Sequence, residues 1–88
     1  MIKLRRYWFR FHPIGRPTPL NLGCGVTAYD YDDALGLIAA RVFPGENVPR
    51  IEQVIEDVDI SKLDAKHVLP NLETPVDRGV WFPKGYTA

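Results

Sequence analysis

The sequence predicts an α+β fold, in which a mostly antiparallel sheet of about four strands carries one main helix on one face, in the order β-β-α-β-β. Three observations indicate this fold: an aromatic segment that alternates with period two, a single stretch with helical period, and short strand-like runs after it. A chain of 88 residues is expected to form a single domain over residues 1–88, because chains divide into several cores only at greater length.

The first strand is expected over residues 3–11. Tyr7, Phe9 and Phe11 fall on one face, which we assign to the core. The opposite face carries three side chains expected to be exposed: Arg6, Trp8 and Arg10. Residues 12–19 contain three prolines and a glycine, which predicts a loop because proline has no N–H to donate.

A second strand is expected over residues 20–28, with Leu22, Val26 and Ala28 facing inward. Gly23 and Gly25 indicate a bulge or a close backbone approach within it.

The chain then changes to helical period, and five apolar residues share one side: Ala34, Leu35, Ile38, Ala39 and Val42. Asp30 is a suitable N-cap, and Asp32 and Asp33 suit the first turn because the helix dipole favours acids there. Pro44 and Gly45 end a helix of about 12 residues.

Residues 51–60 fit either a helix or a strand, and their β-branched residues favour the strand. Residues 79–82 predict an edge strand within a proline-containing tail. One helix covers one sheet face, so the other face is expected to meet solvent, a partner or a second copy in a homodimer.

The net charge is zero, but residues 1–29 hold five basic residues and no acidic one, whereas residues 30–66 hold nine acidic and four basic residues. Basic and acidic strands could neutralise each other side by side, or the asymmetry could serve a partner. A single cysteine, Cys24, and the lack of a signal-like or membrane-spanning apolar stretch predict a cytoplasmic protein that does not bind membranes.

Motifs for catalysis and cofactors are weak. Residues 23–28 match G-x-G-x-x-A, but no helix follows directly, so we expect the glycines to shape a strand. Cys24, His12 and His67 have no spacing typical of a nucleophile and its base or of a metal site. We therefore predict no enzyme, no cofactor and no metal, and a small enzyme using one of these residues is the last alternative.

A cluster of acids and tyrosines is the candidate site. Such groups suit recognition of a basic protein surface, because tyrosine gives contact area at low entropy cost and carboxylates pair with arginine. The predicted partner-binding residues are Tyr29, Asp30, Tyr31, Asp32, Asp33, Glu56, Asp57 and Asp59. The competing interpretation is a helix cap and a solvated strand face.

The alternative site is the outer face of the first strand, where Trp8 lies between Arg6 and Arg10. An aromatic between guanidinium groups is typical of surfaces that stack single-stranded bases. A neutral chain lacks the broad basic field that usually accompanies such binding. The competing interpretation is that the C-terminal tail covers Trp8 together with Trp81.

Residues 22–34, 54–59, 67–71 and 79–83 together resemble a group of short, uncharacterised bacterial proteins, a likeness that implies no activity. In size, fold class and acid-tyrosine cluster the chain is similar to immunity proteins of contact-dependent growth inhibition. That resemblance implies a non-enzymatic protein-binding module that inhibits a basic toxin domain. A single-stranded nucleic-acid-binding module is the first alternative.

Overall fold

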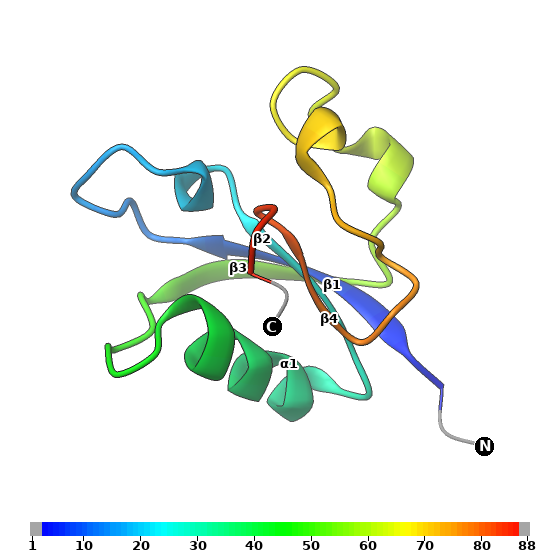
Figure 1. The fold of residues 1–88 in the computed structure, drawn as a ribbon, viewed down its shortest axis with the longest axis horizontal. Helices are drawn as coiled ribbons and strands as arrows, with labels where there is room; N and C mark the ends of the chain where they lie inside the picture. The colour runs from blue at the N-terminus through cyan, green and yellow to red at the C-terminus, as the bar shows by residue number, and fades with distance from the viewer. Residues whose placement is uncertain (1–2, 87–88) are drawn as a thin grey trace.

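The computed structural model describes residues 3–86 and shows a small α+β fold (Figure 1). Its strands are β1 (Arg5–Phe11), β2 (Cys24–Ala28), β3 (Ile51–Glu56) and β4 (Gly79–Phe82). They form one four-stranded antiparallel sheet in the order β3-β1-β2-β4. Helix α1 (Tyr31–Leu37) continues into a π-helical turn (Ile38–Val42). The predicted fold class and the β-β-α-β-β order are confirmed.

The larger core lies between the sheet and α1. Tyr7, Phe9 and Phe11 of β1 all face it, as their alternation predicts. Val26 and Ala28 of β2 join them and are fully buried. The period-two pattern therefore identified the helix-facing side of both central strands.

Helix α1 begins as the sequence predicts. The Asp30 side chain accepts a hydrogen bond from the Asp33 N–H at 2.8 Å, which satisfies one of the free donors of the first turn. The buried set differs from the prediction, because Leu37 is buried, Ala39 is exposed and Leu35 is only partly buried. Burying the larger Leu37 side chain removes more apolar surface from water.

Strand β2 is shorter than predicted, because residues 19–21 form a 3-10 turn (Pro19–Asn21) and the strand begins only at Cys24. Leu22 lies outside the strand and is exposed, so the prediction that it faces inward is wrong. Gly23, between turn and strand, has a φ of +143°, a conformation that favours glycine. The predicted close approach is confirmed: a Cβ at Gly23 would overlap the Trp8 ring, and one at Gly25 would overlap the Trp81 ring.

Most of the second face of the sheet is covered, so the prediction of a fully open face is wrong for its central part. A second core contains Trp8, Val68, Trp81 and Phe82. Partly buried residues from the chain between β3 and β4 pack against it: Val58, Ile60, Leu63 and Leu72. In Figure 1 this connection and α1 lie on opposite sides of the strands. Part of this face stays open along β3 and the end of β1, where Arg10, Gln53 and Ile55 are exposed.

Candidate protein-binding surface

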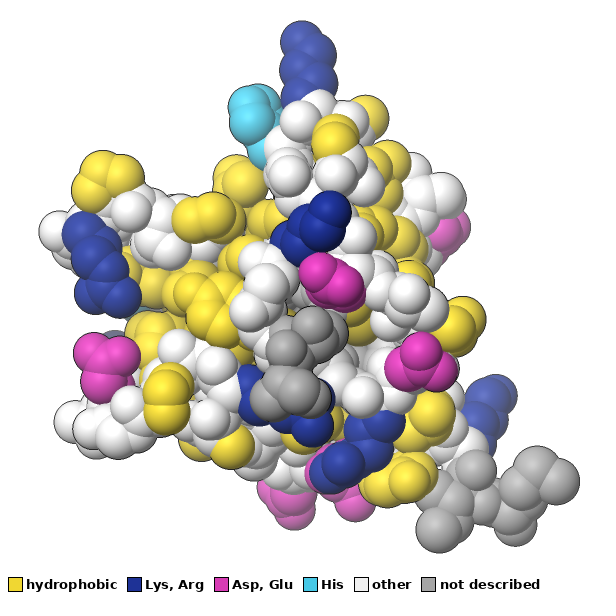
Figure 2. Space-filling model, viewed as in Figure 1, with side chains coloured by type: hydrophobic (Ala, Val, Ile, Leu, Met, Phe, Trp, Pro, Cys, Tyr) yellow, Lys and Arg dark blue, Asp and Glu magenta, His cyan; other side chains and the backbone are white. Residues whose placement is uncertain are grey.

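Antiparallel pairing gathers most of the acid-tyrosine cluster at one end of the sheet. Arg5 pairs with Ala28, directly before Tyr29 and Asp30, and Tyr7 pairs with Glu56. Burial raises the pKa of the Tyr7 hydroxyl, the nearby Arg5 lowers it, and the carboxylates of Glu56 and Asp30 raise it further. Acidic and basic side chains lie close together at the lower right of Figure 2, the end at which β1 begins in Figure 1.

We call this region the acidic end. It comprises Tyr29, Asp30, Tyr31, Asp32, Asp33, Glu56 and Asp57.

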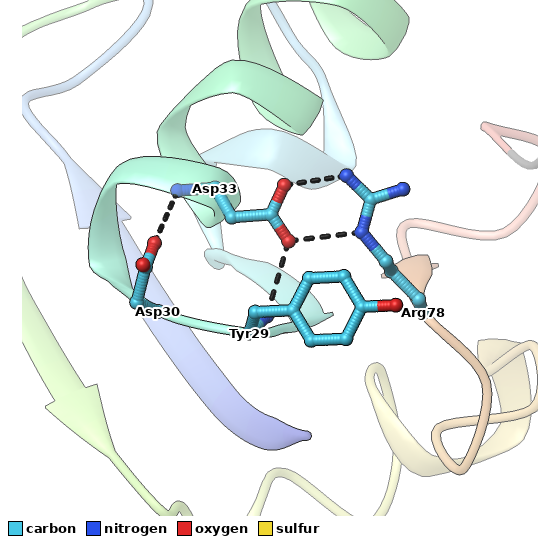
Figure 3. A network of polar contacts seen from close by, with 4 residues as sticks. All are labelled: Tyr29, Asp30, Asp33 and Arg78. Carbon is cyan, nitrogen blue, oxygen red and sulfur yellow. Dashed lines mark hydrogen bonds and ion pairs between the residues drawn. The ribbon is translucent and has the colours of Figure 1, made fainter. Parts of the chain in front are cut away.

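Asp33 is engaged within the protein. Figure 3 shows its carboxylate accepting hydrogen bonds from the Arg78 guanidinium, with Nε 2.9 Å from Oδ2 and Nη2 close to Oδ1. The Tyr29 N–H also donates to Oδ2 at 3.0 Å. The hydrogen bonds from Arg78 are the main reason why the pKa of Asp33 is lowered to about 2. Asp33 therefore joins the start of α1 to the residue before β4, and its charge is neutralised.

The two tyrosines are exposed but positioned. Tyr29 is 48% exposed, and the Arg78 guanidinium carbon lies 5.3 Å from its ring centroid, which allows a cation–π interaction. Tyr31 is 36% exposed, and its ring centroid is 5.9 Å from that of Phe9. Asp32, between them in sequence, is exposed. Each ring thus has one side packed and another side available to a partner.

The acids after β3 have separate roles. Glu56 is exposed at the end of the strand. Asp57 has a φ of +52° and pairs with Arg5 at 3.1 Å, although both side chains are about half exposed, so solvent weakens the pair. Asp59 accepts hydrogen bonds from Ser61 N and Oγ, which lower its pKa and cap the 3-10 turn Ile60–Lys62. The Arg5–Asp57 pair also shows basic and acidic segments side by side.

The face proposed for nucleic acid is not available as predicted. Trp8 is only 5% exposed, so the expectation that it lies on the surface is wrong, and the competing interpretation that it is covered together with Trp81 is confirmed. Its ring centroid lies 5.9 Å from that of Trp81 and 5.4 Å from that of Phe82. Arg6 donates from Nε to the Pro75 carbonyl at 3.2 Å. Trp8 therefore stacks on protein rings rather than presenting a face to a base.

The residues weighed for catalysis lie apart from the acidic end. Cys24 is fully buried in the helix-side core, and burial raises the pKa of its thiol to about 12. His12 and His67 are both exposed, and His67 Nδ1 lies 3.3 Å from Asp64 Oδ1. The G-x-G-x-x-A segment belongs largely to β2, as expected of glycines that shape a strand. Over residues 3–86, no group of three or more His, Cys, Asp or Glu residues is arranged to hold a metal ion.

Sequence reasoning missed Arg78. It is 45 residues from Asp33, and its immediate neighbours Asp77 and Gly79 carry no pattern that identifies an ion-pair partner. The Asp30 cap, by contrast, is a local motif within four residues.

None of three comparisons, with protein-family models, with curated proteins and with solved structures, found a match to this chain. In residues 3–86 there is no helix with the length and apolar character needed to cross a bilayer.

Proposed function

We propose that the chain is a cytoplasmic, non-enzymatic protein-binding module that contacts a basic protein through its acidic end, as a bacterial immunity protein contacts a toxin domain. The proposal depends chiefly on two exposed tyrosines that are held in place beside exposed carboxylates. Tyr29, Tyr31, Asp32 and Glu56 form the contact set.

Positioning matters because binding costs the conformational entropy of every side chain that it orders. The contacts of Tyr29 with Arg78 and of Tyr31 with Phe9 order both rings before a partner arrives. Large aromatic side chains with restricted motion are common among residues that contribute most to interface affinity. The tyrosines are therefore the expected source of affinity.

The carboxylates would act at longer range. Asp32 and Glu56 are exposed and can attract a basic surface before contact, which raises the association rate at low salt. Asp33 is excluded from the contact set because Arg78 already neutralises it. Asp30 is expected to contribute mainly through the helix cap.

The test begins with a pull-down from the source lysate and mass spectrometry of the eluate. The ratio of the eluate's absorbance at about 260 nm to that at about 280 nm, read before and after a high-salt wash, shows whether nucleic acid is bound. The captured protein is then purified and titrated against wild-type chain and against Tyr29→Ala, Tyr31→Ala and Asp32→Asn. We expect a basic partner whose Kd rises about 10-fold or more for either tyrosine variant. The rise for Asp32→Asn should be smaller and should disappear at high salt.

Glu46→Gln is the matched control, because it removes one exposed carboxylate from the loop before β3, at the opposite end of that strand from Glu56. Equal weakening by Glu46→Gln and Asp32→Asn would mean that only net charge matters. Salt-released nucleic acid without a protein partner would contradict the proposal.

A further inference from the structure

A second candidate site lies at the opposite end of the sheet from the acidic end. The 3-10 turn before β2, the end of β4 and the connection between β3 and β4 enclose an open cavity of about 350 Å³. Its apolar lining includes Leu22, Phe82 and Pro83.

Four polar side chains line this cavity, two lysines together with His67 and Asn71. Lys66 and Lys84 line it and are exposed, and His67 lies beside them. No Asp or Glu side chain lines the cavity within residues 3–86. An apolar lining with two ammonium groups favours a ligand that has an apolar body and a negative charge.

A neighbouring hollow of about 320 Å³ shares Leu22 with this cavity. Arg10 and Lys62 line it, which extends the cationic surroundings, and it holds one acid, Asp64. The Asp64 carboxylate accepts hydrogen bonds from Lys66 N at 2.8 Å and His67 N at 2.9 Å. These bonds hold the Asp64 carboxylate in its own turn and lower its pKa, so it stays ionised and is the one negative charge in this hollow among the described residues.

We propose that the cavity binds an amphipathic organic anion, with an apolar or aromatic body against Leu22, Phe82 and Pro83 and one acidic headgroup near the ammonium groups of Lys66 and Lys84. A volume of about 350 Å³ lies at the lower end of the range of small-molecule pockets. The headgroup, whether carboxylate, sulfonate or phosphate, is the shared recognition element. This site does not depend on the proposed protein-binding function, because no residue of the acidic end lines it.

The probe is 1-anilinonaphthalene-8-sulfonate, compared with the uncharged N-phenyl-1-naphthylamine. Both have an aromatic body, but only the first has the anionic group, so the pair separates charge recognition from apolar binding. Fluorescence titration of the full chain should show saturable binding of the sulfonate at one site per chain. Urea unfolding of each variant checks that the fold is intact.

Three variants test the assignment. Lys84→Met should raise the Kd of the sulfonate about 5-fold, and Lys66→Met with Lys84→Met about 10-fold or more. The Kd of the neutral probe should be unchanged in both. Leu22→Asp places a carboxylate at the exposed wall that the two hollows share, and it should abolish binding of the sulfonate.

Lys3→Met is the matched control, because it removes one exposed lysine from residues just before β1, near the acidic end. We expect it to leave both Kd values unchanged. Three results would overturn the proposal: no saturable binding of the sulfonate, equal effects of Lys3→Met and Lys84→Met, or equal affinity of wild type for the charged and neutral probes.

Discussion

Replacing Asp33 by Asn tests the link between α1 and the segment before β4. The pKa of Asp33 is lowered from 3.8 to about 2, chiefly by hydrogen bonds from Arg78. One pKa unit corresponds to about 1.4 kcal/mol, so without solvent screening this pKa shift would contribute about 2.5 kcal/mol to the free energy of unfolding. The Arg78 side chain is 40% exposed and solvent screens the interaction, so we expect a loss of about 1 to 2 kcal/mol near neutral pH.

The sign of the pH dependence follows from the lowered pKa. A carboxyl group whose pKa is lower in the folded state stabilises the protein at pH values above its unfolded pKa, and this stabilisation is lost as pH falls through the folded pKa. The difference between wild type and Asp33→Asn should therefore be complete at about pH 7 and fall to roughly half at about pH 3. Urea unfolding followed by tryptophan fluorescence measures it at each pH.

Asp32→Asn is the matched control for this experiment. Asp32 lies in the same first helical turn but is exposed, so its replacement should cost less than about 0.5 kcal/mol through the helix dipole alone. Equal losses for the two variants, or a loss for Asp33→Asn that does not change between about pH 7 and about pH 3, would refute the assigned ion pair.

Further variants test the packing. Gly25→Ala should lower the free energy of unfolding by about 3 kcal/mol, because the new Cβ would overlap the buried Trp81 ring. Gly36→Ala should raise the free energy of unfolding by about 0.5 to 1 kcal/mol, because Gly36 is exposed in the helix and has open space around it. Denaturant unfolding distinguishes the two signs. Trp8→Ala should cost about 3 to 5 kcal/mol, and a negligible cost would mean that the ring is exposed after all. Cys24 should resist a thiol-reactive dye near neutral pH in the folded chain and react fully in urea, and rapid labelling of folded protein would contradict its burial.

The fold class could be predicted because its signals are local. The alternation of Tyr7, Phe9 and Phe11 identifies a strand and its buried side, and Asp30 before a helical period identifies where α1 begins. Each signal lies within a few residues along the chain, so no knowledge of distant partners was needed.

The covered second face could not be predicted in the same way. The alternation of β1 predicts that Trp8 and Tyr7 point to opposite faces of the sheet, but it does not indicate which residues pack on Trp8. Its cover comes from residues such as Val58, Leu63 and Val68, which lie in irregular chain beside short 3-10 turns and have no period to detect. Gly23 and Gly25 did predict that another group lies close to the backbone, and the structure shows that the Trp8 and Trp81 rings leave no room for a Cβ at these positions.

The sequence predicted which residues form the candidate site, but not which of them are exposed and which are already paired within the protein. Tyr29 and Tyr31 are exposed, whereas Asp33 is neutralised by a residue far along the chain. Ion pairs between distant residues depend on the tertiary fold, and the sequence held no motif that joins Asp33 to Arg78. The lysine-lined cavity was missed for the same reason, since Lys66 and Lys84 come to line one cavity only after the chain has folded.

The position of β4 has a consequence for folding during synthesis. It is the last strand in chain order, yet it pairs with β2, more than 50 residues earlier, and supplies side chains to both cores, Val80 on the helix side and Trp81 on the other. Until residues 79–82 leave the ribosome, β2 has a bare edge and neither core is complete. Closure of this sheet therefore requires residues 79–82, and we expect it to form in a single event dominated by distant contacts rather than by stepwise growth from the first hairpin.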